Sequence, residues 1–517
     1  MSRSSQVAKN VLTGIIGQMV TMLLSFITRT VFIHTLSAAY LGVSGLFTSI
    51  LTVLNLSELG IGVSITFALY KPISEKDNDT IKLLMSFYER SYKIIGFVVL
   101  IIGLAIMPFL DKLISGGSDL ANVRIVFILY ILETVASYWL FAYKRTLLEA
   151  NQQKYIVTLY NTLTTLIISL LRIVVLLILK SNPEVAFYSY TIVGIAGQIL
   201  NNILISRQVD KQFPFLKSRT GRKLSKEQIT PIYKNIAGAS ISKISGIMLT
   251  SVDNILISAF INVSLVGVYS NYIALRTYVT KPISIIFESI TASVGNYCAT
   301  ETKEKQEEFF HTIQFTYFWI YGFCSISLWI LLNPFIGTVW INKDYLLSDT
   351  AVFLIVINFL LDGLSGAVIK FRDANGLYWQ AKYRYLFSAV FNGIISYILV
   401  KVLGIEGVLL GTTASIIIMI SLDPIIVYKN VFNKSAMSYY IRFFGYLLLV
   451  AGTGTLVTLI VCPFNEPTIL NFCIKVLVCL LVPNGIWLAM FAKTKNMILL
   501  KKYASSIIVY AKKAITK

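Results

Sequence analysis

Apolar runs of about 20 residues recur from one end of this 517-residue chain to the other. A helix of about that length crosses the hydrocarbon core of a bilayer. Only helices and closed barrels satisfy their backbone hydrogen bonds in lipid, and these runs are too long for barrel strands. Charged residues make up 14% of the chain, against about 25% in soluble domains. The sequence therefore predicts an all-α membrane protein.

Polar breaks divide the apolar sequence into about fourteen predicted transmembrane helices. They are expected at residues 11–36, 40–69, 82–110, 122–143, 155–179, 185–205, 235–260, 265–297, 310–333, 350–369, 383–400, 404–428, 440–462 and 468–491. The first six form an N-terminal lobe, 1–205, which a basic linker, 206–234, joins to a second lobe of six, 235–428. The remainder, 429–517, holds the last two helices and a basic tail.

Most of the 45 lysines and arginines fall in alternate breaks, on the same side as the N-terminus. Because cytoplasmic loops carry the excess of Lys and Arg, both termini are expected in the cytoplasm. Basic loops facing anionic lipid also account for the net charge of +20, so no nucleic-acid partner is predicted.

Three pairs of segments suggest an internal repeat. "LSAAYLGVSGLFTSI" (36–50) resembles "INVSLVGVYSNYIAL" (261–275), and Gly42 falls at the place of Gly267. "KIIGF" (93–97) matches "WIYGF" (319–323), and "LEANQQKY" (148–155) resembles "DANGLYWQAKY" (373–383). The order predicts two parallel six-helix bundles with two appended helices, a transporter plan in which the substrate path runs between the bundles.

Four cations fall inside predicted spans. Arg29 lies past the middle of the first helix, Arg172 lies at similar depth in the fifth, and Arg276 and Lys243 lie in the eighth and seventh. Charged groups at such depth are costly and point to function. Either they snorkel or pair structurally, or they form a cationic cavity for an anionic ligand, and phosphate suits the planar fork of arginine.

Five acids accompany these cations. Glu133 and Asp362 occupy roughly equivalent midplane positions of the two repeats, where they either carry a coupling proton or sodium ion or neutralise the arginines. Asp253 occupies nearly the repeat position of the first-helix arginine, which suggests an ion pair at the bundle interface. Glu58 and Glu288 lie in the inner halves of their helices, where an inner gate could close.

Several kinds of chemistry have no motif in the chain. It has no nucleotide-binding P-loop, and two histidines without a Cys/His cluster predict no metal site. A membrane glycosyltransferase or polymerase would be expected to show a sizeable external loop carrying acids, whereas the predicted external segments are short. No catalytic residue and no cofactor are therefore expected.

The N-terminal third carries a resemblance to a known family. Besides Arg29, the segments "YLGVSGLF", "LSELGIG", "YKPISEKD" and "YKRTLLEANQQKY" are similar to bacterial polysaccharide flippases of the Wzx type. These belong to the multidrug/oligosaccharidyl-lipid/polysaccharide (MOP) exporter superfamily. The match covers the whole chain in topology, and its specific motifs lie in about the first 160 residues.

The resemblance implies twelve core helices in two V-shaped lobes of a bacterial plasma-membrane protein that works by alternating access. Its cargo would be an oligosaccharide repeat unit on undecaprenyl pyrophosphate, which glycosyltransferases make in the cytoplasm and a polymerase uses outside, in capsule or other surface polysaccharide synthesis. The last two helices would form a groove for the lipid tail, as in the related lipid II flippase.

On this hypothesis Arg29, helped by Arg276, Arg172 and Lys243, holds the pyrophosphate in the cavity. An inside-negative membrane potential favours outward movement of the anion, and H⁺ or Na⁺ on one of the midplane acids compensates the charge. The alternatives are a multidrug or cation antiporter of the same superfamily and a lipid II flippase.

Overall fold

The computed structural model describes residues 3–501, apart from 56–60, 117–121, 219–223, 226–228, 231, 234–235, 237–246 and 248–250. Every regular element in the described residues is a helix. This confirms the all-α prediction. The chain forms two compact units, Met1–Gly267 and Val268–Lys517.

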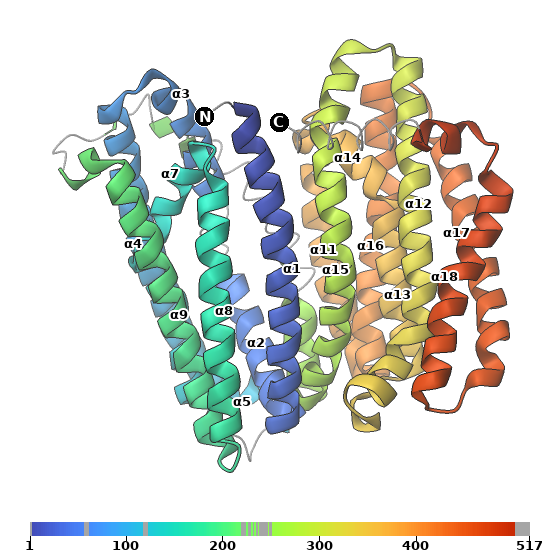
Figure 1. Cartoon of the computed structure of the whole chain (residues 1–517), viewed down its shortest axis with the longest axis horizontal. Helices are drawn as coiled ribbons and strands as arrows, with labels where there is room; N and C mark the ends of the chain where they lie inside the picture. Colours follow the sequence, from blue (N-terminus) through green and yellow to red (C-terminus); the bar gives the residue numbers. More distant parts are fainter. Residues whose placement is uncertain are drawn as a thin grey trace. The chain divides into compact units, whose positions relative to one another are not determined.

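Unit 1 contains a row of long helices joined by short ones. Its helices are α1 (Arg3–Thr35), α2 (Ala38–Leu54), α3 (Ile61–Glu75), α4 (Asn78–Ile106), α5 (Leu110–Leu113), α6 (Val123–Trp139), α7 (Arg145–Ala150), α8 (Lys154–Ile178) and α9 (Pro183–Gln212). Helix α8 packs between α1 and α9 (Figure 1). Helix α6 packs between α4 and α9. A further helical segment, 251–260, and the start of α11 (Val263–Thr300) complete the unit.

Unit 2 contains the rest of α11 and seven further α-helices. These are α12 (Lys303–Pro334), α13 (Asp349–Leu364), α14 (Gly366–Ala374), α15 (Tyr378–Leu403), α16 (Ile405–Val427), α17 (Met437–Val461) and α18 (Ile469–Phe491). Helix α13 packs between α12 and α16, and α15 packs on α16. Helices α17 and α18 lie against α12 (Figure 1).

The described residues contain eight helices that are long and apolar enough to cross a membrane. A ninth span results if Val123–Trp139 and Ala142–Ala150, which are bent by 46° at a short break, count as one. Three shorter apolar helices lie at Ala38–Leu54, Ser251–Phe260 and Phe387–Leu403. The chain is therefore a multi-pass membrane protein, and the larger count of about fourteen helices stays a prediction, as do the expected lobe boundaries.

Side-chain caps fix where several of these helices begin. The Asn122 side chain accepts hydrogen bonds from the first backbone N–H groups of α6, and Ser348 accepts one from Ala351 at the start of α13. Asn262 does the same for Leu265 in α11. Asn and Ser are preferred at these positions because their oxygens satisfy N–H groups that the helix leaves open.

Glycine lets two helices touch through their backbones within unit 1. A Cβ atom on Gly42 of α2 would collide with the Val263 carbonyl oxygen, and one on Gly267 would collide with the Ala38 carbonyl oxygen. The contact is reciprocal, since each glycine faces the first residue of the other helix. The similarity between the two segments therefore has a packing cause: both supply the small residue that a close helix crossing requires.

Aromatic packing attaches the last two helices to α12. Phe318 of α12 stacks on Tyr446 of α17 with ring centroids 4.3 Å apart, and Trp487 of α18 lies 4.8 Å from the Phe318 ring. The Trp487 indole N–H donates to Thr453 at 3.1 Å, and Trp319 donates to Asn484 at 2.9 Å. These buried donors are satisfied, so α12, α17 and α18 form one packed layer.

Candidate functional site

An arginine of unit 1 is anchored by a neighbouring helix. Arg172 of α8 donates from Nε to the Tyr190 carbonyl oxygen at 3.2 Å, and its guanidinium lies 4.2 Å from the centroid of the Tyr190 ring. Gly194 gives it room, because a Cβ there would collide with the guanidinium. Helix α9 thus holds this arginine through both backbone and ring contacts.

A second arginine and acid lie together in unit 2. Arg276 of α11 and Asp362 of α13 approach to 4.0 Å, with side chains 27% and 54% exposed. A direct charge-assisted hydrogen bond is about 2.7–2.9 Å long, so this pair is loose. The ring of Tyr321 on α12 stacks with that of Tyr317, with the ring centroids 5.8 Å apart. Both charged groups remain accessible to a ligand.

The sequence placed Glu133 and Asp362 at related positions and left their role open between ion coupling and neutralisation. In unit 2, Asp362 approaches Arg276 to 4.0 Å. Both roles stay predictions for both acids.

The remaining predicted site residues are dispersed. Arg29 is half-buried on α1, and Asp253 is 4% exposed within helical segment 251–260. Both belong to Met1–Gly267, and the pair expected between them stays a prediction. Glu288 is exposed on α11, and Lys243 and Glu58 lie outside the described residues.

A buried ion cluster in unit 2 has no counterpart in the sequence predictions. Arg372, Arg384 and Asp423 are 3%, 5% and 2% exposed. Arg372 bridges to Asp373 at 2.7 Å and to Asp423 at 3.3 Å, and Arg384 also pairs with Asp423. The count of Lys and Arg at the ends of the predicted spans assigns Arg372 and Arg384 to cytoplasmic loops. The missed signal is Asp423 near the end of an apolar run, an acid that needs a buried partner.

Unit 1 has a comparable pair. Lys144 Nζ lies 2.7 Å from the Asp210 carboxylate and donates to Ser206 at 2.9 Å. In each unit the ion pair links the short segment after α6 or α13 to the last long helix of the expected bundle, α9 or α16. Both arrangements tie a short segment to a long helix, and in unit 2 the three charged side chains of Arg372, Arg384 and Asp423 are almost fully buried.

An apolar groove runs between α11, α12 and α18 in unit 2. It has a volume of about 450 Å³ and is lined mainly by aliphatic and aromatic side chains. Its lining includes Leu275, Val279, Phe323, Leu331, Phe472 and Leu480. Leu275 immediately precedes Arg276, so the groove and the loose ion pair lie on neighbouring faces of α11. Sequence reasoning missed the groove because apolar residues on a span do not show which face meets a partner helix.

No family model matches the chain, and no curated protein sequence matches it. Solved structures do match. The lipid II flippase MurJ in an inward closed conformation superposes with a TM-score of 0.63 at 15% identity, covering 93% of this chain and 99% of that one. An inward-facing multidrug resistance MATE family transporter of the MOP superfamily gives a TM-score of 0.58 at 16% identity, covering 78% and 93%. A mutant of the Vibrio cholerae MATE transporter VcmN gives 0.56 at 15% identity, covering 84% and 98%. The chain shares its fold with these three solved structures.

Proposed function

We propose that the protein is a flippase that moves undecaprenyl-pyrophosphate-linked oligosaccharide repeat units from the cytoplasmic to the outer leaflet by alternating access. The observation that carries this proposal is that Arg276, which is loosely paired with Asp362, directly follows Leu275, a residue that lines the apolar groove of unit 2. A lipid-linked oligosaccharide has a pyrophosphate between a polar head and a long apolar tail. A cation at the edge of an apolar groove matches that sequence of groups.

The proposal includes fourteen helices in two parallel repeats of six plus α17 and α18. The caps at the helix starts support it. Asn122 caps α6 and Ser348 caps α13, and these two caps are separated along the chain by nearly the same number of residues as Gly42 and Gly267. Helix neighbours support it too, because α4, α6, α9 and α8 pack in the same order in unit 1 as α12, α13, α16 and α15 do in unit 2.

The other cations extend the proposed head-group site. Arg29, Arg172 and Lys243 would add positive charge along the path, and the loose arginine–acid pair of unit 2 would open to accept the pyrophosphate. The membrane potential contributes about 2.3 kcal/mol per charge per 100 mV toward outward movement of an anion. H⁺ or Na⁺ on Glu133 or Asp362 would compensate the return of the empty carrier.

The remaining acids take conformational roles in the proposal. Glu58 and Glu288 would close the inner gate, and Asp253 would pair with a cation of the first repeat. The protein would lie in the bacterial plasma membrane with both termini in the cytoplasm, between glycosyltransferases that supply the lipid-linked unit and a polymerase that consumes it. No catalytic residue is assigned, because transport breaks no covalent bond.

Two alternative functions are each represented among the similar solved structures. The likeness to MurJ favours lipid II as cargo, and the likeness to MATE proteins favours a multidrug or cation antiporter. The accessible arginine of unit 2 argues against the antiporter, since a cationic drug would be repelled by it.

Reconstituted vesicles test the proposal. A fluorescent undecaprenyl pyrophosphate oligosaccharide in the inner leaflet of a vesicle becomes accessible to an impermeant reductant outside only after it is flipped. We expect flipping by the native chain, and a reduction of about tenfold with Arg276→Gln, the loss of one charge-assisted contact. Arg124→Gln is the matched control, because Arg124 pairs at an exposed site with Asp111. Transport of lipid II alone, or drug efflux without flipping, would replace the proposal by the corresponding alternative.

A further inference from the structure

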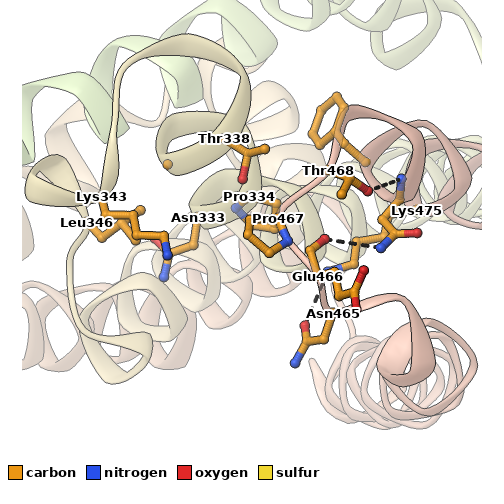
Figure 2. A pocket seen from close by; sticks show the side chains of 13 residues that line it. Asn333, Pro334, Thr338, Lys343, Leu346, Asn465, Glu466, Pro467, Thr468 and Lys475 are labelled. Atoms are coloured by element: carbon orange, nitrogen blue, oxygen red, sulfur yellow. Dashed lines mark hydrogen bonds between the residues drawn. The ribbon is translucent and has the colours of Figure 1, made fainter.

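A small polar cavity lies where α12 ends and α18 begins (Figure 2). Its volume is about 170 Å³. One wall comes from the end of α12 and the turns that follow it, including Asn333 and Lys343, and the other comes from residues 465–475. Figure 2 shows Lys343 on one side and Thr468 and Lys475 on the other. All of these residues belong to unit 2.

Lys475 is the buried cation of this cavity. It is 7% exposed, and its Nζ donates to the Asn465 side-chain oxygen at 3.4 Å. Within the described part of the chain, no carboxylate forms an ion pair with it. An ammonium group has three donors, and a single long contact to a neutral amide leaves most of that capacity unused. Burying a charge in this state is costly unless a counter-charge arrives.

The surroundings of Lys475 favour an anion. Thr468 caps α18, so the positive end of a 23-residue helix lies at the cavity. The Lys343 ammonium adds a second positive charge from the exposed side, against the single carboxylate of Glu466 in the lining. Two ammonium groups and one carboxylate leave the cavity net positive.

The cavity continues into the apolar groove. Phe472 lines both. Pro334 and Lys475 line the cavity, and the residues that follow them, Phe335 and Val476, line the groove. A positive polar pocket therefore opens onto an apolar channel along one seam between α12 and α18. This arrangement matches an amphiphile with an anionic head and not a free inorganic ion alone.

We propose that this cavity binds the phosphate or pyrophosphate head of a lipid whose hydrocarbon chain lies in the groove, with Lys475 as the principal cation. The predicted orientation puts the site at the outer leaflet. A link to the cargo rests on the proposed function: the site would then hold the head group after translocation. Binding of a phosphate-headed lipid does not depend on that link.

Binding of radiolabelled farnesyl pyrophosphate to the purified full-length chain in detergent tests the proposal. Inorganic pyrophosphate carries only the head and farnesol carries only the tail, so both serve as competitors. We expect farnesyl pyrophosphate to bind, each competitor to displace it at least about tenfold less well than unlabelled farnesyl pyrophosphate, and Lys475→Gln to weaken binding about tenfold or more. Displacement by inorganic pyrophosphate as effective as by farnesyl pyrophosphate would show a free-anion site and overturn the lipid proposal.

Lys401→Gln is the matched control, since Lys401 lies on α15 with its Nζ 4.0 Å from the Tyr397 ring. Lys475→Met is a second variant that fills the same space without charge, and a melting curve verifies that each variant is folded. Unchanged affinity in both folded Lys475 variants would refute the proposal. A chain that binds farnesyl pyrophosphate through Lys475 yet flips no oligosaccharide would refute the proposed function and leave this site standing.

Discussion

Replacing Asp423 by Asn removes the shared counter-charge of the buried Arg372–Asp423–Arg384 cluster. The three side chains are at most 5% exposed, so water cannot replace the lost carboxylate. Removing one partner of a buried ion pair costs about 3–5 kcal/mol. For a domain of about 150–250 residues, 1 kcal/mol corresponds to about 2–4 °C in Tm. We therefore expect Asp423→Asn to lower the melting temperature of unit 2 by about 6–20 °C.

Thermal unfolding of the detergent-solubilised chain, followed by tryptophan fluorescence, measures this change. Trp319 and Trp487 report on unit 2, because they lie in its α12–α18 layer. Asp111→Asn is the control: the Arg124–Asp111 pair is just as close, at 2.8 Å, but its side chains are 56% and 73% exposed. An exposed pair contributes about 0–1 kcal/mol. If Asp423→Asn lowers the melting temperature no more than Asp111→Asn does, burial does not determine how much the cluster stabilises unit 2. The reasoning then fails.

Three further predictions concern packing, capping and the candidate site. Gly267→Ala drives a methyl group into a backbone carbonyl and should lower the free energy of unfolding by about 1–3 kcal/mol. Gly452→Ala should not, because the added methyl group would have open space; equal melting curves for the two variants would contradict the close helix crossing. Asp77 caps α4 and its hydrogen bonds to the Thr80 side chain and backbone hold its pKa below the usual value. The contribution of Asp77 to stability is therefore present above its pKa in the unfolded chain, about 3.9, and is lost as the pH falls through its lower pKa in the folded protein. Thermal unfolding measured at acidic pH should show that Asp77→Ala loses this pH dependence. Asp362→Asn leaves Arg276 without its neighbouring acid and should slow flipping in the vesicle assay, because the arginine then holds the pyrophosphate of the cargo more tightly; an unchanged rate would show that the pair takes no part in transport.

Hydropathy was sufficient to predict the class of fold, because lipid permits few backbone arrangements. The long helices lie where the apolar runs are, and the Asn and Ser caps at their starts could be read directly from the sequence. The sequence showed Gly42 and Gly267 at matching places in two similar segments. The physical reason for both glycines, a direct contact between helix backbones, became clear only from the packing of α2 on α11.

The charged residues were harder to interpret, since a residue's depth along a helix does not reveal which face of the helix it lies on. Arg372 and Arg384 counted as cytoplasmic loop charges, yet they are buried against Asp423. Lys475 lies in the last predicted span, and the structure buries it in a cavity that forms where α12 and α18 pack. Tertiary neighbours decide these environments, and a single sequence does not contain them in readable form.

The reciprocal glycine contact also restricts how the chain can change in length. Successive residues of an α-helix are rotated by about 100°. Deleting one residue between Ala38 and Gly42 would bring the branched side chain of Val43 to the Val263 carbonyl, and a deletion in α11 would displace Gly267 in the same way. Insertions and deletions are therefore expected to be tolerated in the loops of homologous chains and excluded from the first turns of α2 and α11.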